Sequence, residues 1–280
     1  MKKVISLDIG GTNTRVALIN EKYKIEKVVI NPTLLGNKDA FLSSVGATID
    51  QCVGKDFKDV VAIAGGLPGR INMSGHIDAL PNIGIEDVDL AEYLHKRFGL
   101  KTYIANDASV AALSEANVGP HKKYKSLYFI TVSTGVGGAL CIDGKLRRHS
   151  DEIGHTLFCS GHGNYHEFEH MVSGTYLPRL GKEDGIEVAS AFDFFVGVKN
   201  KIDSLMPTYW NWLDLFARFI KSIQDAFQPE VFVLTGGVMK SADVFWDDLR
   251  QRCPESNLQK CHFSQEAGLI GAAVYGFQNA

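Results

Sequence analysis

The feature that most constrains this chain is a glycine turn that directly follows a short apolar strand and occurs three times. The turns are Gly10-Gly11-Thr12-Asn13-Thr14, Gly135-Val136-Gly137-Gly138 and Gly236-Gly237. Because glycine lacks a Cβ atom, such a turn lets several backbone N–H groups approach one anion. Any one of these turns is also explained by a plain hairpin connection. Three of them in one chain suggest a fold that binds a nucleotide with several phosphates.

Two widespread nucleotide-binding motifs are missing from the sequence, which narrows the class of fold. No turn continues as Gly-x4-Gly-Lys-Ser/Thr, so the chain is not a P-loop enzyme, and none has the Gly-x-Gly-x-x-Gly spacing of a dinucleotide fold. The 280 residues suffice for one large domain or two of moderate size. With 45% apolar and 22% charged residues, the chain has an ordinary globular composition and can form a sizeable core.

Composition also limits the expected partners and compartment. The net charge is −3, so no basic excess points to nucleic acid or to a lipid surface. Residues 1–8 lack the apolar stretch of a signal peptide, and no window approaches the ~18–20 apolar residues that span a bilayer. The five cysteines are odd in number and widely spaced, which is typical of reduced thiols. We therefore expect a cytoplasmic protein without a nucleic-acid or membrane partner.

Hydrophobic spacing and turn residues predict alternating strands and helices. The expected strands are residues 4–7, 16–19, 24–30, 60–64, 102–105, 126–132, 139–142 and 231–234. The expected helices are residues 87–98, 108–116, 212–227 and 266–275. Residues 119–123, which contain Gly-Pro and polar side chains, are expected to be a linker. The aromatic residues Tyr209, Trp210 and Trp212 are expected to pack in the interior rather than bind a sugar.

Each half of the chain opens with a strand, a turn of small polar residues and glycine, a second strand and a tight turn. Two similar units that face each other would form a cleft in which a ligand can bind. In the first half, Asp107 follows the expected strand 102–105 and precedes a helix, so its carboxylate lies at a strand end. There it can accept the proton of an attacking hydroxyl, or it can simply cap the helix. The residues alone leave both roles open.

Eight short segments follow one another along nearly the whole chain. They are Asp8-Ile9-Gly10-Gly11-Thr12-Asn13-Thr14-Arg15, Leu67-Pro68-Gly69-Arg70, Pro81-Asn82-Ile83-Gly84, Asn106-Asp107-Ala108, Ser133-Thr134-Gly135-Val136-Gly137-Gly138, Glu152-Ile153-Gly154-His155, Phe168-Glu169 with Ser173-Gly174, and Thr235-Gly236-Gly237-Val238. Together and in this order they resemble the ROK family (repressors, open reading frames, kinases) of the sugar kinase/actin/Hsp70 superfamily. The resemblance implies an α/β, two-lobed actin-like ATPase (ribonuclease H-like) fold. It also implies a smaller lobe of residues 1–118 completed by the C-terminal helix 265–280, a larger lobe of residues 119–264, and an active site in the cleft.

The same resemblance implies ATP-dependent transfer of the γ-phosphoryl group to the 6-hydroxyl of glucose or of an N-acyl hexosamine. Specific alternatives are a kinase for N-acetylmannosamine, N-acetylglucosamine, fructose or allose. An alternative of another class is a non-catalytic, sugar-sensing protein of the family. A repressor is not expected, because the family's repressors carry a helix-turn-helix domain before the first motif, and Asp8 lies close to the start. We expect a homodimer, and we expect Ile85, which stands where a tryptophan is usual, to affect the choice of sugar.

The resemblance assigns a role to each matching residue. Asp107 would be the catalytic base, and Asn106 would hold a neighbouring sugar hydroxyl. The other sugar contacts would come from Gly69, Arg70, Asn82, Glu152, His155 and Glu169. The ATP contacts would come from Gly10, Gly11, Thr12, Asn13, Thr134, Gly135, Gly236 and Gly237. Asp8 would position Mg²⁺ through water, since this ion keeps most of its hydration shell.

One segment departs from the family's metal-binding pattern. Most relatives carry a zinc site made of the histidine of Glu-Ile-Gly-His and three cysteines, and here the three cysteine positions hold Ser160, His162 and Glu167. A different zinc set, with three imidazole nitrogens and one thiolate, could come from His155, Cys159, His162 and His166. The alternative is a metal-free loop held by ordinary hydrogen bonds. The sequence leaves both open.

Overall fold

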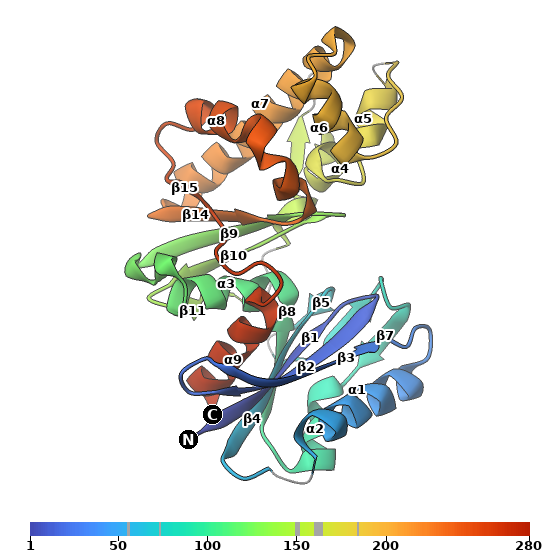
Figure 1. Ribbon diagram of the computed structural model, residues 1–280, viewed down its shortest axis with the longest axis vertical. Coiled ribbons are helices and arrows are strands. Elements are labelled where there is room, and N and C mark those ends of the chain that lie inside the picture. The colour runs from blue at the N-terminus through green and yellow to red at the C-terminus, as the bar shows by residue number, and fades with distance from the viewer. Residues whose placement is uncertain (55–56, 73, 149–151, 160–164, 184) are drawn as a thin grey trace. The chain divides into compact units, whose positions relative to one another are not determined.

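The computed structural model describes residues 1–54, 57–72, 74–148, 152–159, 165–183 and 185–280 (Figure 1). The chain is a mixed α/β protein that divides into two compact units. The first unit comprises Met1–Lys125, Ala139–Asp151 and His262–Ala280, and the second comprises Ser126–Gly138 and Glu152–Cys261. The lobe boundaries expected from the sequence stay a prediction.

The sheet of the first unit has the strand order β3-β2-β1-β4-β8. Its strands are β1 (Lys3–Ile9), β2 (Asn13–Asn20), β3 (Ile25–Pro32), β4 (Val60–Leu67) and β8 (Thr102–Asn106). The first three form an antiparallel meander, whereas β4 runs parallel to β1 and β8 runs parallel to β4. The carboxyl ends of β1, β4 and β8 therefore meet at one edge of the sheet, where Asp8 and Asn106 lie.

Helices cover both faces of this sheet (Figure 1). One face is covered by α1 (Lys38–Val53) and α2 (Leu90–Phe98), and the other by α3 (Asp107–Asn117) and α9 (Ala267–Asn279). Neighbouring residues of β2 pack against different helix layers, because successive side chains of a strand point to opposite faces of the sheet. Val16 belongs to the core beneath α1, and its neighbour Ala17 packs with Leu269 of α9.

A small antiparallel sheet follows β4 in the chain. Its last strand includes residues that were expected to begin a helix. It consists of β5 (Arg70–Ile71), β6 (Ile77–Leu80) and β7 (Ile85–Val88). The helix expected over residues 87–98 is therefore wrong at its start, because Val88 pairs with Ile77 in this sheet. The helix begins after Asp89, whose side chain accepts a hydrogen bond from the backbone N–H of Glu92 and so caps it.

The segment expected to be a linker, residues 119–123, has regular structure and lies just before the boundary between the units. Pro120–Lys123 forms a 3₁₀ helix, η1, within the first unit. Its His121 is buried, and the Nδ1 atom lies 2.6 Å from Oε2 of Glu115 in α3. The Oε1 atom of Glu115 accepts hydrogen bonds from the backbone N–H groups of His262 and Phe263 at 2.8 and 2.9 Å. A buried carboxylate with these partners ties the polar segment to the unit.

The second sheet has the strand order β11-β10-β9-β14-β15. Its strands are β9 (Ser126–Val132), β10 (Val136–Ile142), β11 (Lys145–Leu146), β14 (Val231–Thr235) and β15 (Leu258–Lys260). β14 pairs in parallel with both β9 and β15. The ends of β9 and β14 are therefore adjacent, and the glycine turns that follow Val132 and Thr235 lie at the same edge of the sheet.

The rest of the second unit is mainly helical and has an aromatic core. Its elements are the 3₁₀ helices η2 (Ile153–His155), η3 (Asp203–Leu205) and η4 (Gly237–Ser241), the hairpin strands β12 (Leu157–Cys159) and β13 (Tyr165–Glu167), and the helices α4 (Glu169–Val172), α5 (Leu177–Glu183), α6 (Ala191–Lys199), α7 (Met206–Phe227) and α8 (Ala242–Arg252). The ring of Trp212 in α7 lies edge-on to Phe195 and Phe245. Tyr209 and Trp212 are buried as expected, whereas Trp210 is 38% exposed.

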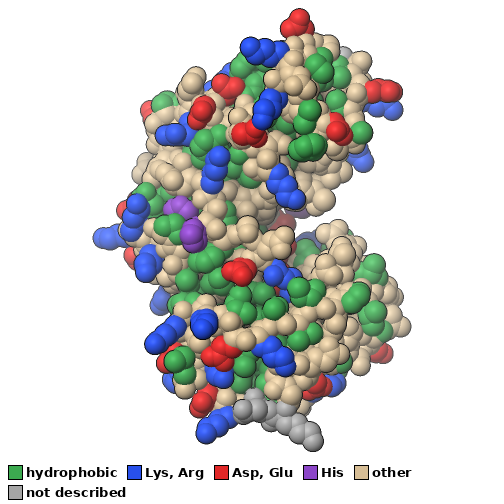
Figure 2. All heavy atoms as spheres, in the orientation of Figure 1, with side chains coloured by type: hydrophobic (Ala, Val, Ile, Leu, Met, Phe, Trp, Pro, Cys, Tyr) green, Lys and Arg blue, Asp and Glu red, His purple; other side chains and the backbone are tan. Residues whose placement is uncertain are grey.

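The described helices and the surface charge bear on possible partners. Among the described residues, no helix is both long and apolar enough to cross a membrane. On the face drawn in Figure 2, basic side chains are interspersed with acidic and apolar ones. This mixture of signs agrees with the small net charge of −3.

Candidate functional site

The first glycine turn connects β1 to β2 and lies against the loop between β6 and β7. Gly10 donates its backbone N–H to the carbonyl oxygen of Asn13 at 2.9 Å, which closes the turn. A Cβ atom on Gly11 would lie 2.9 Å from the backbone oxygen of Asn82, so this close approach requires glycine. Thr12 is exposed at the tip of the turn. The structure thus brings a predicted phosphate turn together with Asn82, a predicted sugar residue.

Asp8 is the charged residue beside this turn. It lies directly opposite Arg15 in the β1–β2 ladder, and Nη1 of Arg15 donates to Oδ2 of Asp8 at 3.0 Å. Arg15 also donates to the carbonyl oxygen of Gln265. Burial raises the pKa of the Asp8 carboxyl above its ordinary value, and the charge and hydrogen bond of Arg15 offset part of this increase. The start of α9 also packs against Asp8, since a Cβ atom added to Gly268 would lie 2.8 Å from Cγ of Asp8.

Asn106 and Asp107 lie where β8 ends and α3 begins. Oδ1 of Asn106 accepts a hydrogen bond from the backbone N–H of Ala108 at 3.0 Å, and Oδ1 of Asp107 accepts from the same group at 2.8 Å. Nδ2 of Asn106 donates to the carbonyl oxygen of Gly69 at 3.2 Å. Gly69 has a φ of 141°, and a Cβ atom there would lie 2.3 Å from the carbonyl oxygen of Ala79. Asn106 is therefore the N-cap, and the half-buried Asp107 carboxylate lies in the first turn of the helix.

The second glycine turn follows β9 and is bound to α4. Ser133 donates its backbone N–H to the carbonyl oxygen of Gly135 at 2.8 Å, and Gly174 donates its N–H to the carbonyl oxygen of Ser133 at 2.6 Å. The backbone N–H of Val136 donates to Oε2 of Glu169 at 3.1 Å. A Cβ atom on Gly135 would lie 2.5 Å from that same oxygen. Glu169, a predicted sugar residue, is thus fixed against a predicted phosphate turn.

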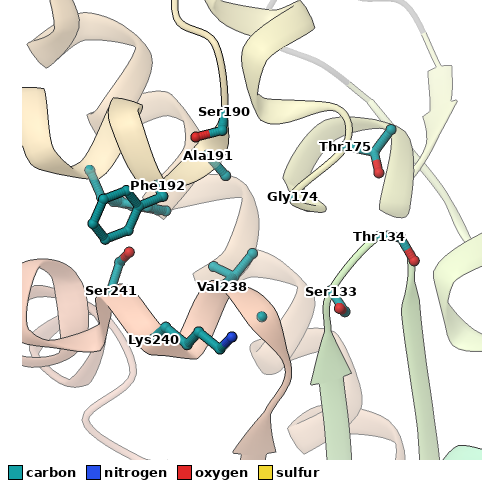
Figure 3. Close-up of a pocket in the computed structure, with 12 residues that line it drawn as sticks. Ser133, Thr134, Gly174, Thr175, Ser190, Ala191, Phe192, Val238, Lys240 and Ser241 are labelled. Atoms are coloured by element: carbon teal, nitrogen blue, oxygen red, sulfur yellow. The ribbon is translucent and has the colours of Figure 1, made fainter.

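The third glycine turn follows β14 and borders a cavity of about 300 Å³ (Figure 3). Gly236 has a φ of 104°, and a Cβ atom there would lie 2.2 Å from the carbonyl oxygen of Val132, so glycine is required. The cavity walls include Thr134, Gly174, Phe192, Gly237 and Lys240. Figure 3 shows the Lys240 side chain extended so that its amine points toward Ser133. The cavity therefore combines an exposed aromatic ring, hydroxyl groups and a cation.

Glu152, His155, Glu167 and Glu169 form an acid–histidine cluster in the second unit. Nδ1 of His155 lies 2.9 Å from Oε2 of Glu167, and Nε2 lies 3.7 Å from Oε2 of Glu152. The hydrogen bond that His155 donates to Glu167 raises the pKa of His155 above its ordinary value, and the same bond lowers the pKa of Glu167. One ligand atom each of His155, Glu167 and Glu169 lie within 4.8 Å of one another. Carboxylate oxygens and an imidazole at this spacing can bind several hydroxyl groups of one ligand.

Comparison of the sequence and the structure with known proteins identifies the family. The model of the ROK family matches residues 4–277. The chain belongs to the ROK family. It is 26% identical to a glucokinase of Streptomyces coelicolor over 98% of this chain and 97% of the relative, and 28% identical to the N-acetylgalactosamine kinase AgaK of a Shewanella species over 85% and 82%. A solved ROK family glucokinase from Streptomyces griseus, in complex with glucose and AMPPNP, is similar with a TM-score of 0.77 at 22% identity over 99% of both chains.

The predicted resemblance to this family and the predicted α/β, two-lobed actin-like ATPase (ribonuclease H-like) fold are confirmed. The zinc set that the sequence suggested for this ROK protein does not assemble among the residues that the structure describes. In the β12–β13 hairpin, Cys159 pairs with Tyr165 and Phe158 pairs with His166. Because directly paired residues share a face and successive residues alternate, Cys159 and His166 point to opposite faces. His162 lies outside the described residues, and Nδ1 of His155 is bound to Glu167.

The structure therefore groups the predicted site residues of this ROK protein by unit. In the first unit, contacts join Gly10 to Asn13, Gly11 to Asn82 and Gly69 to Asn106, whereas Arg70 is exposed beside Gly69. Those of the second unit gather around Glu169 and around the cavity of Figure 3. The roles of all these residues stay predictions, as do the homodimer and the cytoplasmic location.

Three residues of these groups were missed by the sequence reasoning. Lys240 follows the third glycine turn by three residues, so its place beside a predicted ATP-binding turn is a usable signal. Phe192 belongs to an apolar run whose sequence gives no sign of a binding role, yet it is 63% exposed at the cavity. Glu167 stands at a cysteine position of the relatives, and its contact with His155 has no separate signal in the sequence.

Proposed function

We propose that this ROK protein is an ATP-dependent hexose kinase that phosphorylates the 6-hydroxyl of glucose or of an N-acyl hexosamine. The relatives support this proposal, since one is named a glucokinase and another an N-acetylgalactosamine kinase. The similar structure with glucose and AMPPNP supports ATP as the phosphoryl donor. These names cover two classes of hexose, so the sugar itself has to be found by experiment.

The observation that carries the proposal is the Asp107 carboxylate in the first turn of α3. Asn106 caps this helix and also bonds to Gly69, so the backbone at Asp107 is fixed from both sides. A fixed carboxylate is a suitable general base for a substrate hydroxyl. In the proposed reaction Asp107 takes the proton of the 6-hydroxyl and the freed oxygen bonds to the γ-phosphorus. The bond between the γ-phosphorus and the bridging oxygen breaks, and ADP leaves.

We assign candidate substrate contacts in each unit separately. For the sugar these are Asn82, Asn106 and the Gly69-Arg70 backbone of the first unit, with Glu152, His155 and Glu169 of the second. Each hydroxyl that is buried without a partner costs about 1–3 kcal/mol, so several fixed polar groups are needed.

The nucleotide would be held by the three glycine turns. The cavity of Figure 3 suits its nucleoside end, because Phe192 and Val238 offer apolar surface and Thr134 offers a hydroxyl. Lys240 adds a positive charge for the phosphates. Asp8 and the exposed side-chain oxygen of Thr12 are donors of the kind that Mg²⁺ takes. When bound, the ion would neutralise part of the phosphate charge.

A coupled assay of ADP release tests the proposal directly. The sugar panel would contain glucose, mannose, fructose, allose, N-acetylglucosamine, N-acetylmannosamine and N-acetylgalactosamine. We expect ADP release that depends on one or a few of these sugars, because the pocket must match the hydroxyl pattern. Binding of a sugar without any ADP release would favour a sugar-sensing protein instead, and no response to any sugar would contradict the proposal.

The variant Asp107→Asn then tests the base. Its kcat should fall by about 10²–10⁴-fold, the usual contribution of a general base, while sugar binding changes little. The amide keeps the shape of the side chain, and its oxygen can still accept from Ala108, so the helix start should be retained. Retention of more than a few per cent of kcat would remove Asp107 from the proposed role.

A further inference from the structure

The imidazole of His155 is exposed but has one close partner. His155 ends η2, and its side chain is 55% exposed. An exposed side chain samples several rotamers unless a contact holds it, so a residue that must meet a ligand in one orientation needs such a contact. The contact that can hold this ring is the hydrogen bond between Nδ1 and Oε2 of Glu167, at 2.9 Å.

The three carboxylates around His155 are not equivalent. Oε2 of Glu169 already accepts a hydrogen bond from the backbone N–H of Val136 at 3.1 Å. Oε2 of Glu152 lies 3.7 Å from Nε2, which is longer than a hydrogen bond. Glu167 is bound directly to Nδ1, and its position in β13 is fixed by pairing with Leu157 in β12. Glu167 is therefore the carboxylate that can hold the ring.

A metal would be the other way to hold this imidazole. The cysteine positions of the relatives are occupied here by Ser160, His162 and Glu167, and the hairpin register directs Cys159 and His166 to opposite faces. The three cysteines of the zinc site that the family resemblance implies are therefore absent from the sequence, and Ser160 and His162 lie outside the described residues. His155, Glu167 and Glu169 each bring one ligand atom within 4.8 Å of the others, so the metal analysis below is part of the test. The chain offers a carboxylate in contact with Nδ1 where a metal–ligand bond would otherwise be needed.

We propose that Glu167 is a positioning residue that holds the His155 imidazole by a direct hydrogen bond, without a metal, so that Nε2 stays beside Glu152 for sugar binding. This inference rests on the proposed sugar kinase function. The Glu167 carboxylate accepts from Nδ1–H and thereby selects the ring orientation and the protonated nitrogen. The Nε2 atom, which then carries the lone pair, faces the Glu152 carboxylate, and both groups can accept hydrogen bonds from vicinal sugar hydroxyls.

The experiment compares Glu167→Ala and Glu167→Gln with the wild-type protein. For Glu167→Ala we expect the KM and the Kd of the sugar to rise about tenfold, with kcat and the KM of ATP nearly unchanged, because only ground-state positioning is lost. Glu167→Gln should recover most of the affinity, since its amide oxygen can still accept from Nδ1–H. A zinc ligand would behave differently, because an amide does not replace a metal-binding carboxylate. Glu187→Ala, at an exposed acid of the same unit outside the cluster, is the matched control.

A spectroscopic readout makes the test independent of turnover. In ¹⁵N-labelled protein, the imidazole signals of His155 should show a protonated Nδ1 in the wild type and a mixture of tautomers in Glu167→Ala. Metal analysis of untagged protein, purified without added zinc, should show well below about one equivalent of zinc. Near-stoichiometric zinc whose removal weakens sugar binding would overturn the proposal. An unchanged sugar KM together with unchanged imidazole signals in Glu167→Ala would overturn it as well.

The outcomes also separate this inference from the proposed function. If the wild type releases ADP with a sugar but Glu167→Ala matches it in KM and in the His155 signals, only the role of Glu167 fails. If the wild type releases no ADP with any sugar, the kinase proposal fails, and the His155 signals still decide whether Glu167 holds the ring.

Discussion

The turns after β1 and β9 have similar backbones but different chemical surroundings. Each follows a buried strand, leads into the next strand of its sheet and is closed by a short backbone hydrogen bond. The donor and acceptor are Gly10 and Asn13 at 2.9 Å in the first turn, and Ser133 and Gly135 at 2.8 Å in the second. The same local solution therefore occurs in both units, each time at the end of a sheet strand.

The difference lies in where the negative charge comes from. In the first turn Asp8 is part of the strand itself, and it is paired with Arg15 on the next strand. In the second turn, residues 131–138 carry no charged side chain, and the adjacent carboxylate is Glu169 of α4, which accepts the backbone N–H of Val136. We infer that the first turn suits a cation beside the phosphates, whereas the second provides neutral N–H and hydroxyl donors.

The largest expected effect comes from removing the charge of the first turn. Asp8→Asn should lower kcat by about 10²–10³-fold, because a charged group at the phosphates is lost. The thermal midpoint should not fall, since burial disfavours the charged form of Asp8 and the amide removes that cost. Thr134→Val in the second turn should cost only about tenfold, because it removes one neutral hydrogen bond. Equal losses of kcat in the two variants, measured by ADP release, would erase the proposed difference between the turns.

The sequence was most informative where structure depends on neighbouring residues. The strand over residues 126–132 is observed with the expected bounds, because its continuous apolar run matches a buried strand. The helix over residues 87–98 was placed too early because Val88 has helical spacing, while pairing with Ile77 draws it into a sheet. The polar segment 119–123 looked like a linker because nothing local reveals that Glu115, four residues before it, will be buried and bind His121.

In the candidate site, too, some residues could be predicted from the sequence and others could not. Gly10, Gly11, Asn106 and Asp107 could be found because short motifs place them at strand ends. The contacts of Glu167 and the cavity position of Phe192 could not, since they depend on a hairpin register and on packing between distant segments. Residues that act through tertiary contacts leave no periodic or spacing signal in the chain.

A smaller effect is expected from adding a methyl group to each turn. Gly11→Ala should lower the free energy of unfolding by about 1–3 kcal/mol, because its Cβ would lie 2.9 Å from the backbone oxygen of Asn82, which cannot rotate away. Gly135→Ala should lower the free energy of unfolding by about 1 kcal/mol. The new Cβ atom would clash with Oε2 of Glu169, and this side chain can move away only by losing its hydrogen bond from the backbone N–H of Val136. Denaturant melts would measure both.

Gly10→Ala is the matched control for these two variants. Its Cβ would lie 3.8 Å from the carbonyl oxygen of Asn13, which is an ordinary contact. Its free energy of unfolding should stay within about 1 kcal/mol of the wild type. A loss in Gly10→Ala as large as that in Gly11→Ala would mean that the loop containing Asn82 does not restrict the first turn.

The smallest expected effect is a pH dependence that only the first turn should show. The folded pKa of Asp8 is raised above the ordinary value of 3.8, so between these two values the folded protein binds more protons than the unfolded chain. The stability of the wild type should therefore fall, relative to Asp8→Asn, as the pH rises through this window, by about 1.4 kcal/mol for each unit of pKa difference. The stability difference between Thr134→Val and the wild type should stay flat over the same range, since no titratable group changes. Thermal melts from acidic to neutral pH would measure both differences, and a constant gap between wild type and Asp8→Asn would show that Arg15 fully compensates the burial of Asp8.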